Sequence, residues 1–139
     1  MRLLVVDDDA GTRALLREAL DLCGAAVCVV PSAAMARRAI AQWHPTAFIS
    51  DVDMPGEDGL ALIRYVRLLP AGEGGALPAI AFTGYGHDEA NMLDAGFDAV
   101  LAKPVALDTL IETIVHVVDC SRGRGAVASA GAADPARDS

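Results

Sequence analysis

Aromatic residues are scarce in this chain of 139 residues, at 4% of the total, whereas apolar residues as a group reach 53%. A chain of this composition is not disordered throughout, and we expect one domain with a core of Ala, Val, Leu and Ile. Long hydrophobic runs are also lacking. The longest uncharged stretch, residues 22–36, is shorter than the roughly 18 residues of a membrane span, and aspartates follow the first apolar stretch, which a secretory signal would not tolerate. We therefore expect a soluble cytoplasmic protein without membrane insertion.

Basic residues are few as well, with 11 Lys and Arg against 19 Asp and Glu, which gives a net charge of −8. Such a surface repels phosphate backbones and anionic lipids, so we expect no nucleic-acid partner. The three cysteines form no C-x-x-C pair and fit a reducing compartment. We expect no metal or redox site at them, nor at the three histidines, which lie on different expected elements.

Five short apolar runs alternate with segments of helical spacing. The runs span residues 3–6, 25–30, 47–49, 79–82 and 99–102, and each is nearly continuous, as in strands covered on both faces. This alternation predicts an α/β fold in which helices cover both faces of a doubly wound parallel sheet. Residues 120–139 carry small side chains and no periodic apolar face, so we expect residues 1–119 to form the domain and 120–139 a disordered C-terminal tail.

Polar residues gather where the expected strands end, and ligands of doubly wound sheets bind at that edge. These residues are Asp7, Asp8 and Asp9, Asp51 and Asp53, Thr83, and Lys103 with Pro104. Taken singly, each has an ordinary interpretation: Asp9 as a helix cap, Asp51 as a turn residue, or Lys103 as a solvated lysine before a proline. Their coincidence at one edge of one sheet favours a single site instead.

The residue types at this edge suit phosphoryl chemistry. Two carboxylates about 4 Å apart repel by roughly 4 kcal/mol at an effective dielectric of 20, so a cluster of them needs a cation. Mg²⁺ (or Mn²⁺) prefers hard oxygen ligands and is typically held by one or two carboxylates with a phosphate. A further aspartate can then attack a phosphoryl group to form an aspartyl phosphate, while a hydroxyl and an ammonium group bind the phosphoryl oxygens. Thr83 and Lys103 are placed for those two tasks.

Four motifs, V-V-D-D-D, S-D-V-D-M-P-G-E-D-G, F-T-G and A-K-P, closely resemble the receiver domain of two-component response regulators. The resemblance covers nearly all of the expected domain and implies a flavodoxin-like (βα)5 fold with strand order 2-1-3-4-5. It further implies a phosphoacceptor module rather than an enzyme, which takes its phosphoryl group from a histidine kinase or a histidine phosphotransfer protein and signals to an unknown output protein.

The resemblance also assigns roles to individual residues. It makes Asp51 the phosphoacceptor, and it places the metal on Asp7, Asp8, Asp51 and the backbone carbonyl of Asp53. It assigns the phosphoryl oxygens to Thr83, Gly84 and Lys103, and it implies a cis peptide bond before Pro104.

One position departs from the family pattern. Receivers usually carry Tyr or Phe three residues before the lysine as a switch that moves with the threonine, and here that residue is Val100. We hypothesise that Tyr85, two residues after Thr83, takes part in signalling or in shielding the acyl phosphate from water. Thr83, Tyr85 and Val100 are therefore the switch candidates.

Two other functions and one other context remain open. Asp51-Val52-Asp53 after a strand resembles the catalytic pair of haloacid-dehalogenase-like phosphatases, although in those enzymes the second acidic cluster comes late in the chain. A receiver that binds partners without phosphate is the other alternative, against which the intact set of site residues argues. The sequence is also similar to receivers of hybrid histidine kinases, so the chain is either a stand-alone regulator or a piece of such a kinase.

Overall fold

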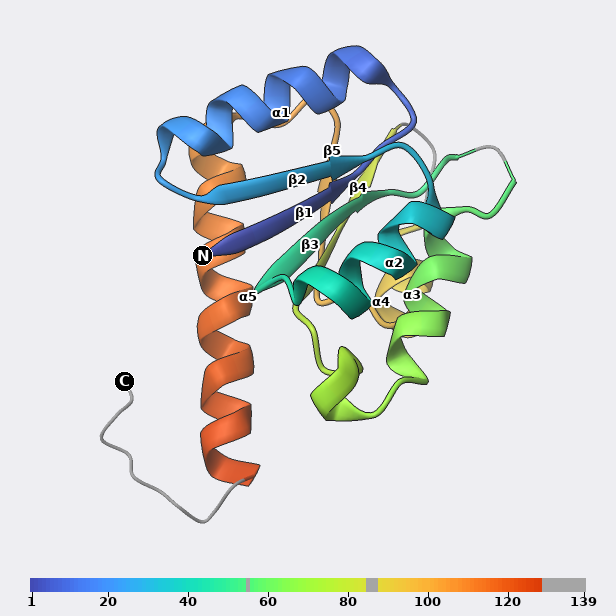
Figure 1. The fold of residues 1–139 in the computed structure, drawn as a ribbon, viewed down its shortest axis with the longest axis vertical. Helices are drawn as coiled ribbons and strands as arrows, with labels where there is room; N and C mark the ends of the chain where they lie inside the picture. The colour runs from blue at the N-terminus through green and yellow to red at the C-terminus, as the bar shows by residue number, and fades with distance from the viewer. Residues whose placement is uncertain (55, 85–87, 129–139) are drawn as a thin grey trace.

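A five-stranded parallel sheet forms the centre of the molecule (Figure 1). The structure is a computed structural model that describes residues 1–54, 56–84 and 88–128. The strands, in the spatial order β2-β1-β3-β4-β5, are β1 (Arg2–Val6), β2 (Ala26–Val30), β3 (Ala47–Asp51), β4 (Ala79–Thr83) and β5 (Ala99–Ala102). Every neighbouring pair is parallel. The doubly wound, flavodoxin-like α/β fold and the strand order 2-1-3-4-5 are therefore confirmed.

Helices connect the strands, and side chains mark where most of them begin. They are α1 (Ala10–Leu22), α2 (Ala33–Trp43), α3 (Gly59–Arg67), α4 (Glu89–Ala95) and α5 (Leu107–Ala128), with a 3₁₀ turn η1 (Ala71–Glu73) before β4. Asp9, Ser32, Asp58 and Asp88 each accept a hydrogen bond from a backbone N–H of the first turn that follows them. These caps satisfy amide groups that have no partner inside the helix.

The sheet separates two hydrophobic layers, because successive residues of a strand point to opposite faces. On β1, Leu3 and Val5 pack with α1 and α5, whereas Leu4 and Val6 pack with α2, α3 and α4. Figure 1 shows α2, α3 and α4 grouped on one side of the sheet, with α5 along the other. Both faces of the central strands are buried, which is why their sequences are continuously apolar rather than alternating.

Helix α5 runs further than the sequence suggested. We expected a tail from residue 120, but the helix continues to Ala128, since extending an existing helix needs no new nucleation. Residues 120–128 are thus helical, and the rest of the expected tail lies outside the described residues. In the part of the chain that the structure describes, no helix is long and apolar enough to cross a membrane.

Candidate functional site

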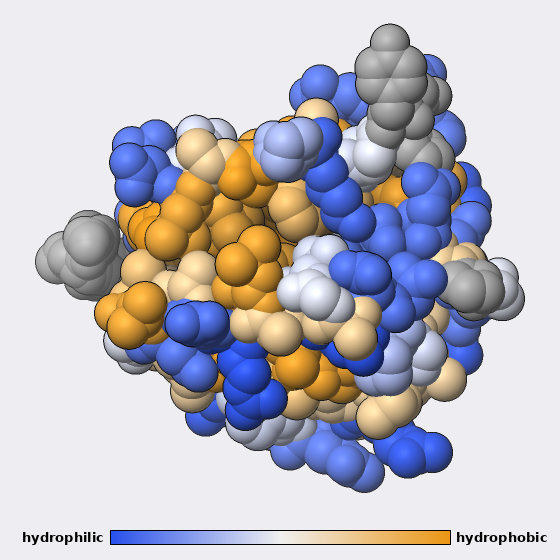
Figure 2. All heavy atoms as spheres, turned by 90° about the horizontal axis from the view of Figure 1, so that it is seen from above, coloured by the Kyte–Doolittle hydropathy of each residue, from blue (hydrophilic) through white to orange (hydrophobic). Residues whose placement is uncertain are grey.

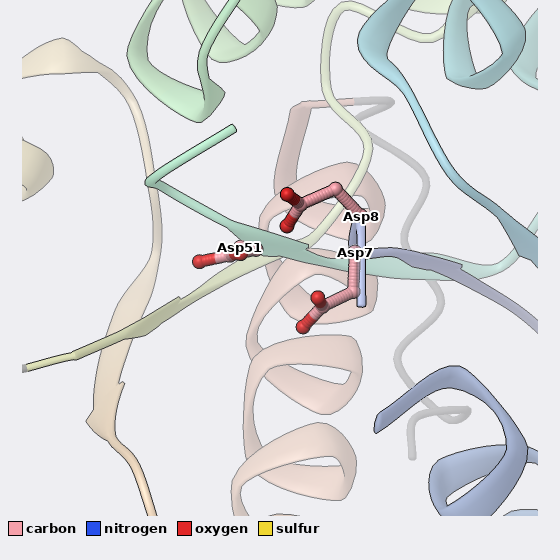
Figure 3. A group of neighbouring side chains, drawn as sticks. All are labelled: Asp7, Asp8 and Asp51. Carbon is pink, nitrogen blue, oxygen red and sulfur yellow. The ribbon is translucent and has the colours of Figure 1, made fainter. Parts of the chain in front are cut away.

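Three carboxylates come together at the carboxyl ends of β1 and β3 (Figure 3). Asp7 and Asp8 directly follow β1, and Asp51 is the last residue of β3. One oxygen of each lies within 4.8 Å of the others. Asp7 and Asp51 are only 1% and 5% exposed, whereas Asp8 is exposed to solvent. The two strands are neighbours in the sheet, so the parallel pairing itself brings together residues that are far apart in the sequence.

Backbone N–H groups orient the two buried carboxylates. The N–H of Asp9 donates to Oδ1 of Asp7 at 2.9 Å, and the N–H of Asp53 donates to Oδ1 of Asp51 at 3.2 Å. Both donors lie two residues after the carboxylate, which is the spacing of an Asx turn. Asp9 itself caps α1, and its hydrogen bonds from the side chain and the backbone of Thr12 lower the pKa of its carboxyl group.

Gly59 brings α3 directly against the end of β3. Its N–H donates to the carbonyl of Val52 at 3.0 Å. A Cβ atom at this position would lie 2.5 Å from the carbonyl oxygen of Asp51, a distance that no side chain tolerates. The preceding residue, Asp58, caps α3 by accepting from the N–H of Ala61 at 2.9 Å. The Asp-Gly pair therefore allows the chain to turn into α3 immediately beside Asp51.

Lys103 reaches the acidic cluster from the end of β5. Its Nζ lies 3.1 Å from Oδ2 of Asp7 and 3.4 Å from Oδ1 of Asp51. The ammonium group also lies 5.3 Å from the ring centroid of Phe82, whose negative face attracts a cation. The backbone N–H of Lys103 donates to the carbonyl of Thr83 at 2.7 Å, which ties this residue to the end of β4.

The charges of the cluster shift two pKa values. Burial raises the pKa of Asp51, and the charge of Asp7 raises it further, against the opposing effect of Lys103. Burial alone would lower the pKa of Lys103, but the hydrogen bond to Asp7 and the charges of both aspartates raise it above its usual value. The lysine is thus held in its charged form, while the carboxylate of Asp51 is still repelled by the charge of Asp7. Additional positive charge at this point would reduce that repulsion.

The other residues predicted at this edge are brought to it by β4 and β5. Thr83 is the last residue of β4 and is buried, and the half-buried Gly84 follows it. The peptide bond between Lys103 and Pro104 is cis. The edge therefore gathers the aspartates, the threonine and the lysine that the sequence pattern singled out.

The proposed switch positions lie in different surroundings. Val100 is half-buried in β5, where it packs against the hydrophobic layer on the side of α2, α3 and α4. Tyr85 lies outside the described residues.

The donor set suits a hard divalent cation. The three oxygens lie within 4.8 Å of one another, whereas two oxygens bonded directly to Mg²⁺ are at most about 4.2 Å apart. Mg²⁺ keeps several of its waters, so a carboxylate slightly outside this range can bind through one of them. Asp7, Asp8 and Asp51 could therefore hold a metal ion.

Two arginines near the site were not predicted from the sequence. Nη1 of Arg13 donates to the backbone carbonyl of Asp7 at 2.7 Å and so braces the turn between β1 and α1. Arg37 on α2 binds both carboxylate oxygens of Glu57, in the connection after β3, at 2.9 and 2.6 Å, and its guanidinium lies 5.0 Å from the ring centroid of Tyr65. The only signal for Arg13 was its place in the first turn of a helix that follows the aspartates.

An apolar hollow of about 390 Å³ adjoins Lys103 between α1 and α5. Figure 2 views the molecule from above α1 and shows hydrophobic surface gathered there among charged side chains. The hollow is lined mainly by apolar residues of α1, of α5 and of the connection between β5 and α5, among them Leu15, Leu16, Val105 and Leu107. Leu15 is 68% exposed, so part of this apolar surface is accessible to solvent.

Comparison with known protein families matches residues 3–115 to the response regulator receiver domain. The chain belongs to the response regulator receiver family. This places it in two-component signal transduction and disfavours the phosphatase alternative. The sequence-based assignment to this family is confirmed.

Several known proteins resemble the chain over most of its length. It is 48% identical over 107 residues to an uncharacterized 14.6 kDa protein of Leptolyngbya boryana, covering 76% of this chain and 80% of the other. It is 38% identical over 113 residues to the response regulator MprA of Mycobacterium tuberculosis; the match covers 80% of this chain but only 47% of MprA. A CheY-like receiver domain protein from Methanospirillum hungatei superposes with a TM-score of 0.80 at 26% identity, covering 88% of this chain and 97% of that one.

Proposed function

We propose that this receiver domain accepts a phosphoryl group on Asp51. The observation that carries the proposal is the position of the Asp51 carboxylate, which lies 3.4 Å from Nζ of Lys103 and beside the oxygens of Asp7 and Asp8. A carboxylate flanked by a cation site and an ammonium group can act as a nucleophile, because positive charge on both sides stabilises the phosphoryl oxygens.

The residues of the cluster fit a resident divalent cation. Asp7, Asp8, Asp51 and the backbone carbonyl of Asp53 would hold Mg²⁺ or Mn²⁺. When bound, the cation neutralises charge that develops on the phosphoryl oxygens.

The remaining site residues bind and orient the phosphoryl group. In the transfer, a carboxylate oxygen of Asp51 forms a bond to phosphorus while the bond from phosphorus to a histidine nitrogen of the donor breaks, and the electron pair stays on that nitrogen. Lys103 holds one phosphoryl oxygen through its ammonium group, and Thr83 and the N–H of Gly84 hold the others. The pKa of Lys103 is raised, so it stays charged throughout.

The signal then reaches a partner through the residues around Thr83. Thr83 and Tyr85 respond to the phosphoryl group, and Val100 takes the place that an aromatic switch residue has in many receivers. Substituting Tyr85 with Ala is expected to change the lifetime of the acyl phosphate or the affinity for a partner. If both stay unchanged, Tyr85 has no part in the switch.

The phosphoryl donor is a histidine kinase or a histidine phosphotransfer protein, and the apolar hollow beside Lys103 offers it a docking surface. The net charge of −8 favours protein partners over nucleic acid for this surface. Residues 1–119 constitute the receiver, its place is the cytoplasm, and it does not turn over phosphate esters as an enzyme would.

The first test is the intact mass of the full chain after incubation with Mg²⁺ and acetyl phosphate. A single phosphoryl adduct is expected for the wild type and none for Asp51→Asn, whereas Ser50→Ala, one residue earlier in β3, should still form it. Repeated turnover of p-nitrophenyl phosphate would instead support the phosphatase alternative. The absence of any adduct in a folded chain, with both acetyl phosphate and a protein donor, would favour a receiver that signals without phosphate.

A second test separates docking from chemistry. Leu15→Arg should slow phosphotransfer from a protein donor but leave the reaction with acetyl phosphate unchanged, because the small donor needs no docking surface. Leu68→Arg is the matched control, since Leu68 is 86% exposed at the end of α3, on the opposite side of the sheet. Equal rates for both variants with the protein donor would show that the hollow is not the docking surface.

A further inference from the structure

The connection between β3 and α3 carries one of the oxygens that we assign to the metal, the backbone carbonyl of Asp53. Its described residues are 52–54 and 56–58. Near its start, the N–H of Asp53 donates to Oδ1 of Asp51 at 3.2 Å. At its end, the N–H of Gly59 donates to the carbonyl of Val52 at 3.0 Å. The residues between these two bonds are held by other contacts.

Arg37 of α2 holds the second half of this connection through Glu57. Nη1 and Nη2 of Arg37 lie 2.9 and 2.6 Å from the two carboxylate oxygens of Glu57, so the guanidinium binds the carboxylate at both oxygens. The same guanidinium lies 5.0 Å from the ring centroid of Tyr65 on α3. One side chain thus ties α2 to the connection and to α3.

This ion pair is better placed to fix a backbone segment than an ordinary surface pair. The side chains of Arg37 and Glu57 are 36% and 26% exposed, so solvent screens their charges less than those of a fully exposed pair. Two N–H···O bonds fix the direction of the carboxylate as well as its distance, which a lysine could not do. The ring of Tyr65 adds a cation–π contact that restricts the guanidinium further. Arg37 therefore constrains where Glu57, and the backbone that carries it, can lie.

We propose that Arg37 is a positioning residue for the metal: by holding Glu57, it keeps the connection, and with it the carbonyl of Asp53, in one conformation before the cation binds. The inference rests on the proposed function, which assigns the cation to the acidic cluster. A ligand from a segment that must first become ordered binds more weakly than a preorganised one, because ordering lowers the backbone entropy. Removing a partner that orients a metal ligand typically costs about 10–100-fold in metal affinity. Arg37 acts through the connection rather than by a bond to a ligand, so we expect the lower end, about 10-fold.

The effect of Arg37 should be confined to this connection. Helix α3 keeps its own anchors, which are the cap by Asp58 and the close approach of Gly59 to the backbone of Asp51. Lys103 reaches Asp51 from the end of β5 and does not depend on α2. Substituting Arg37 should therefore raise the Mg²⁺ concentration that gives half the maximal rate of phosphorylation, and it should leave the rate at saturating Mg²⁺ unchanged.

Two substitutions separate positioning from charge. Arg37→Met removes a positive charge, so long-range electrostatics alone would strengthen cation binding, whereas Glu57→Gln removes a negative charge and would weaken it. If the two residues act as a pair, both substitutions weaken binding by a similar factor. The double variant should then bind no more weakly than either single variant, because each of these already breaks the pair. Arg38→Met is the matched control, since Arg38 is the next residue of α2, carries the same charge and is exposed.

The test is Mn²⁺ binding to the unphosphorylated full chain, with free Mn²⁺ measured by electron paramagnetic resonance well below the Tm of every variant. We expect Kd to rise about 10-fold in Arg37→Met, in Glu57→Gln and in the double variant, and to keep its wild-type value in Arg38→Met. Asp8→Ala should abolish the binding, which would assign it to the acidic cluster. The half-maximal Mg²⁺ concentration for adduct formation with acetyl phosphate should rise by the same factor in Arg37→Met, at an unchanged maximal rate.

Several outcomes would overturn this inference and leave the proposed function intact. Unchanged or tighter Mn²⁺ binding in Arg37→Met would show that Arg37 does not position a ligand, and an equal loss in Arg38→Met would show that the effect is not specific to the pair. Losses that multiply in the double variant would show that Arg37 and Glu57 act independently. If the wild type binds no Mn²⁺, the proposed metal site fails, and the role of Arg37 fails with it.

Discussion

The ion pair between Lys103 and the buried aspartates should stabilise the metal-free protein strongly. Lys103→Met keeps an apolar stem near Phe82 but removes the ammonium group. At an effective dielectric of 20, the 3.1 Å contact with Asp7 corresponds to an attraction of about 5 kcal/mol. The cost of desolvating both groups offsets part of this, and breaking a buried pair typically costs about 3–5 kcal/mol. Because the Lys103 side chain is 28% exposed, we expect the lower end, about 3 kcal/mol.

Thermal unfolding in the presence of a chelator measures this loss. For a domain of this size, about 3 kcal/mol corresponds to a decrease in Tm of roughly 10 °C. Arg17→Met is the matched control, because Arg17 and Asp21 lie 4.0 Å apart and both side chains are 54% exposed, so the loss of this contact should cost less than about 0.5 kcal/mol. A Tm of Lys103→Met that equals that of the wild type or of the control would refute the reasoning.

Two further conditions separate electrostatics from packing. Mg²⁺ should recover much of the stability lost in Lys103→Met, because it brings positive charge to the same carboxylates. The pKa of Lys103 is raised in the folded state, so its contribution is fully present below its unfolded pKa and is lost only as the pH rises through the folded value. At pH 7 the difference from the variant is thus complete. It should shrink as the pH falls through the raised pKa of Asp51, because the protonated carboxyl no longer attracts the ammonium group. If neither Mg²⁺ nor pH changes the stability lost in Lys103→Met, the loss arises from packing rather than from charge.

Three other substitutions test the site. Mg²⁺ at about ten times its Kd should stabilise the wild type by about 1.4 kcal/mol, and Asp8→Ala should abolish most of this stabilisation. If Mg²⁺ raises the Tm of the wild type and of Asp8→Ala equally in thermal melts, the metal site is wrong. The pKa of Asp51 is raised on folding, so its ionisation destabilises the fold as the pH rises through that value. Metal-free Asp51→Asn should therefore be more stable than the wild type in urea unfolding at pH 7, and the gain in stability should be smaller at pH 4. If Asp51→Asn is less stable than the wild type at pH 7, the argument from the raised pKa is wrong. Gly59→Ala should lower the free energy of unfolding in urea by about 1–3 kcal/mol, because the added methyl group overpacks against Asp51. Gly72→Ala is the control, because a Cβ atom there would meet open space. If both substitutions cost the same, the contact with Asp51 does not explain the loss.

Elements with strong apolar patterns could be predicted from the sequence, and those with weak patterns could not. The strands were visible because both faces of the sheet are buried, and their order came with the family resemblance. Helix α4 has only seven residues and one fully buried side chain, Met92, so the strand–helix alternation and the stop at Gly96 were its only signals. The end of α5 was missed because its last turns lack a periodic apolar face.

The candidate site could be predicted as a set of residues but not as a geometry. Parallel strands bring their carboxyl ends to one edge whatever the side chains are, so the aspartates, the threonine and the lysine were bound to meet there. Contacts between distant segments have no such rule. Arg67, for example, donates to the carbonyls of Gly75, Leu77 and Gly96 at 2.7–3.0 Å and pairs with Asp98. No spacing in the sequence links the last turn of α3 to these connections, because their meeting depends on how the helices pack.

Val100 stands where many receivers carry an aromatic switch residue, so we expect a signal from Asp51 to travel through the backbone instead. Lys103 contacts Asp51 through its side chain, and its N–H donates to the carbonyl of Thr83, so one residue joins the proposed phosphoacceptor to the ends of β4 and β5. A phosphoryl group on Asp51 adds negative charge next to Nζ and so competes with Asp7 for the same ammonium group. A shift of Lys103 toward that charge would move the start of the connection to α5 without any ring rotation. In this chain, therefore, α5 and the connection that leads into it are the segments in which we expect phosphorylation to have its largest structural effect.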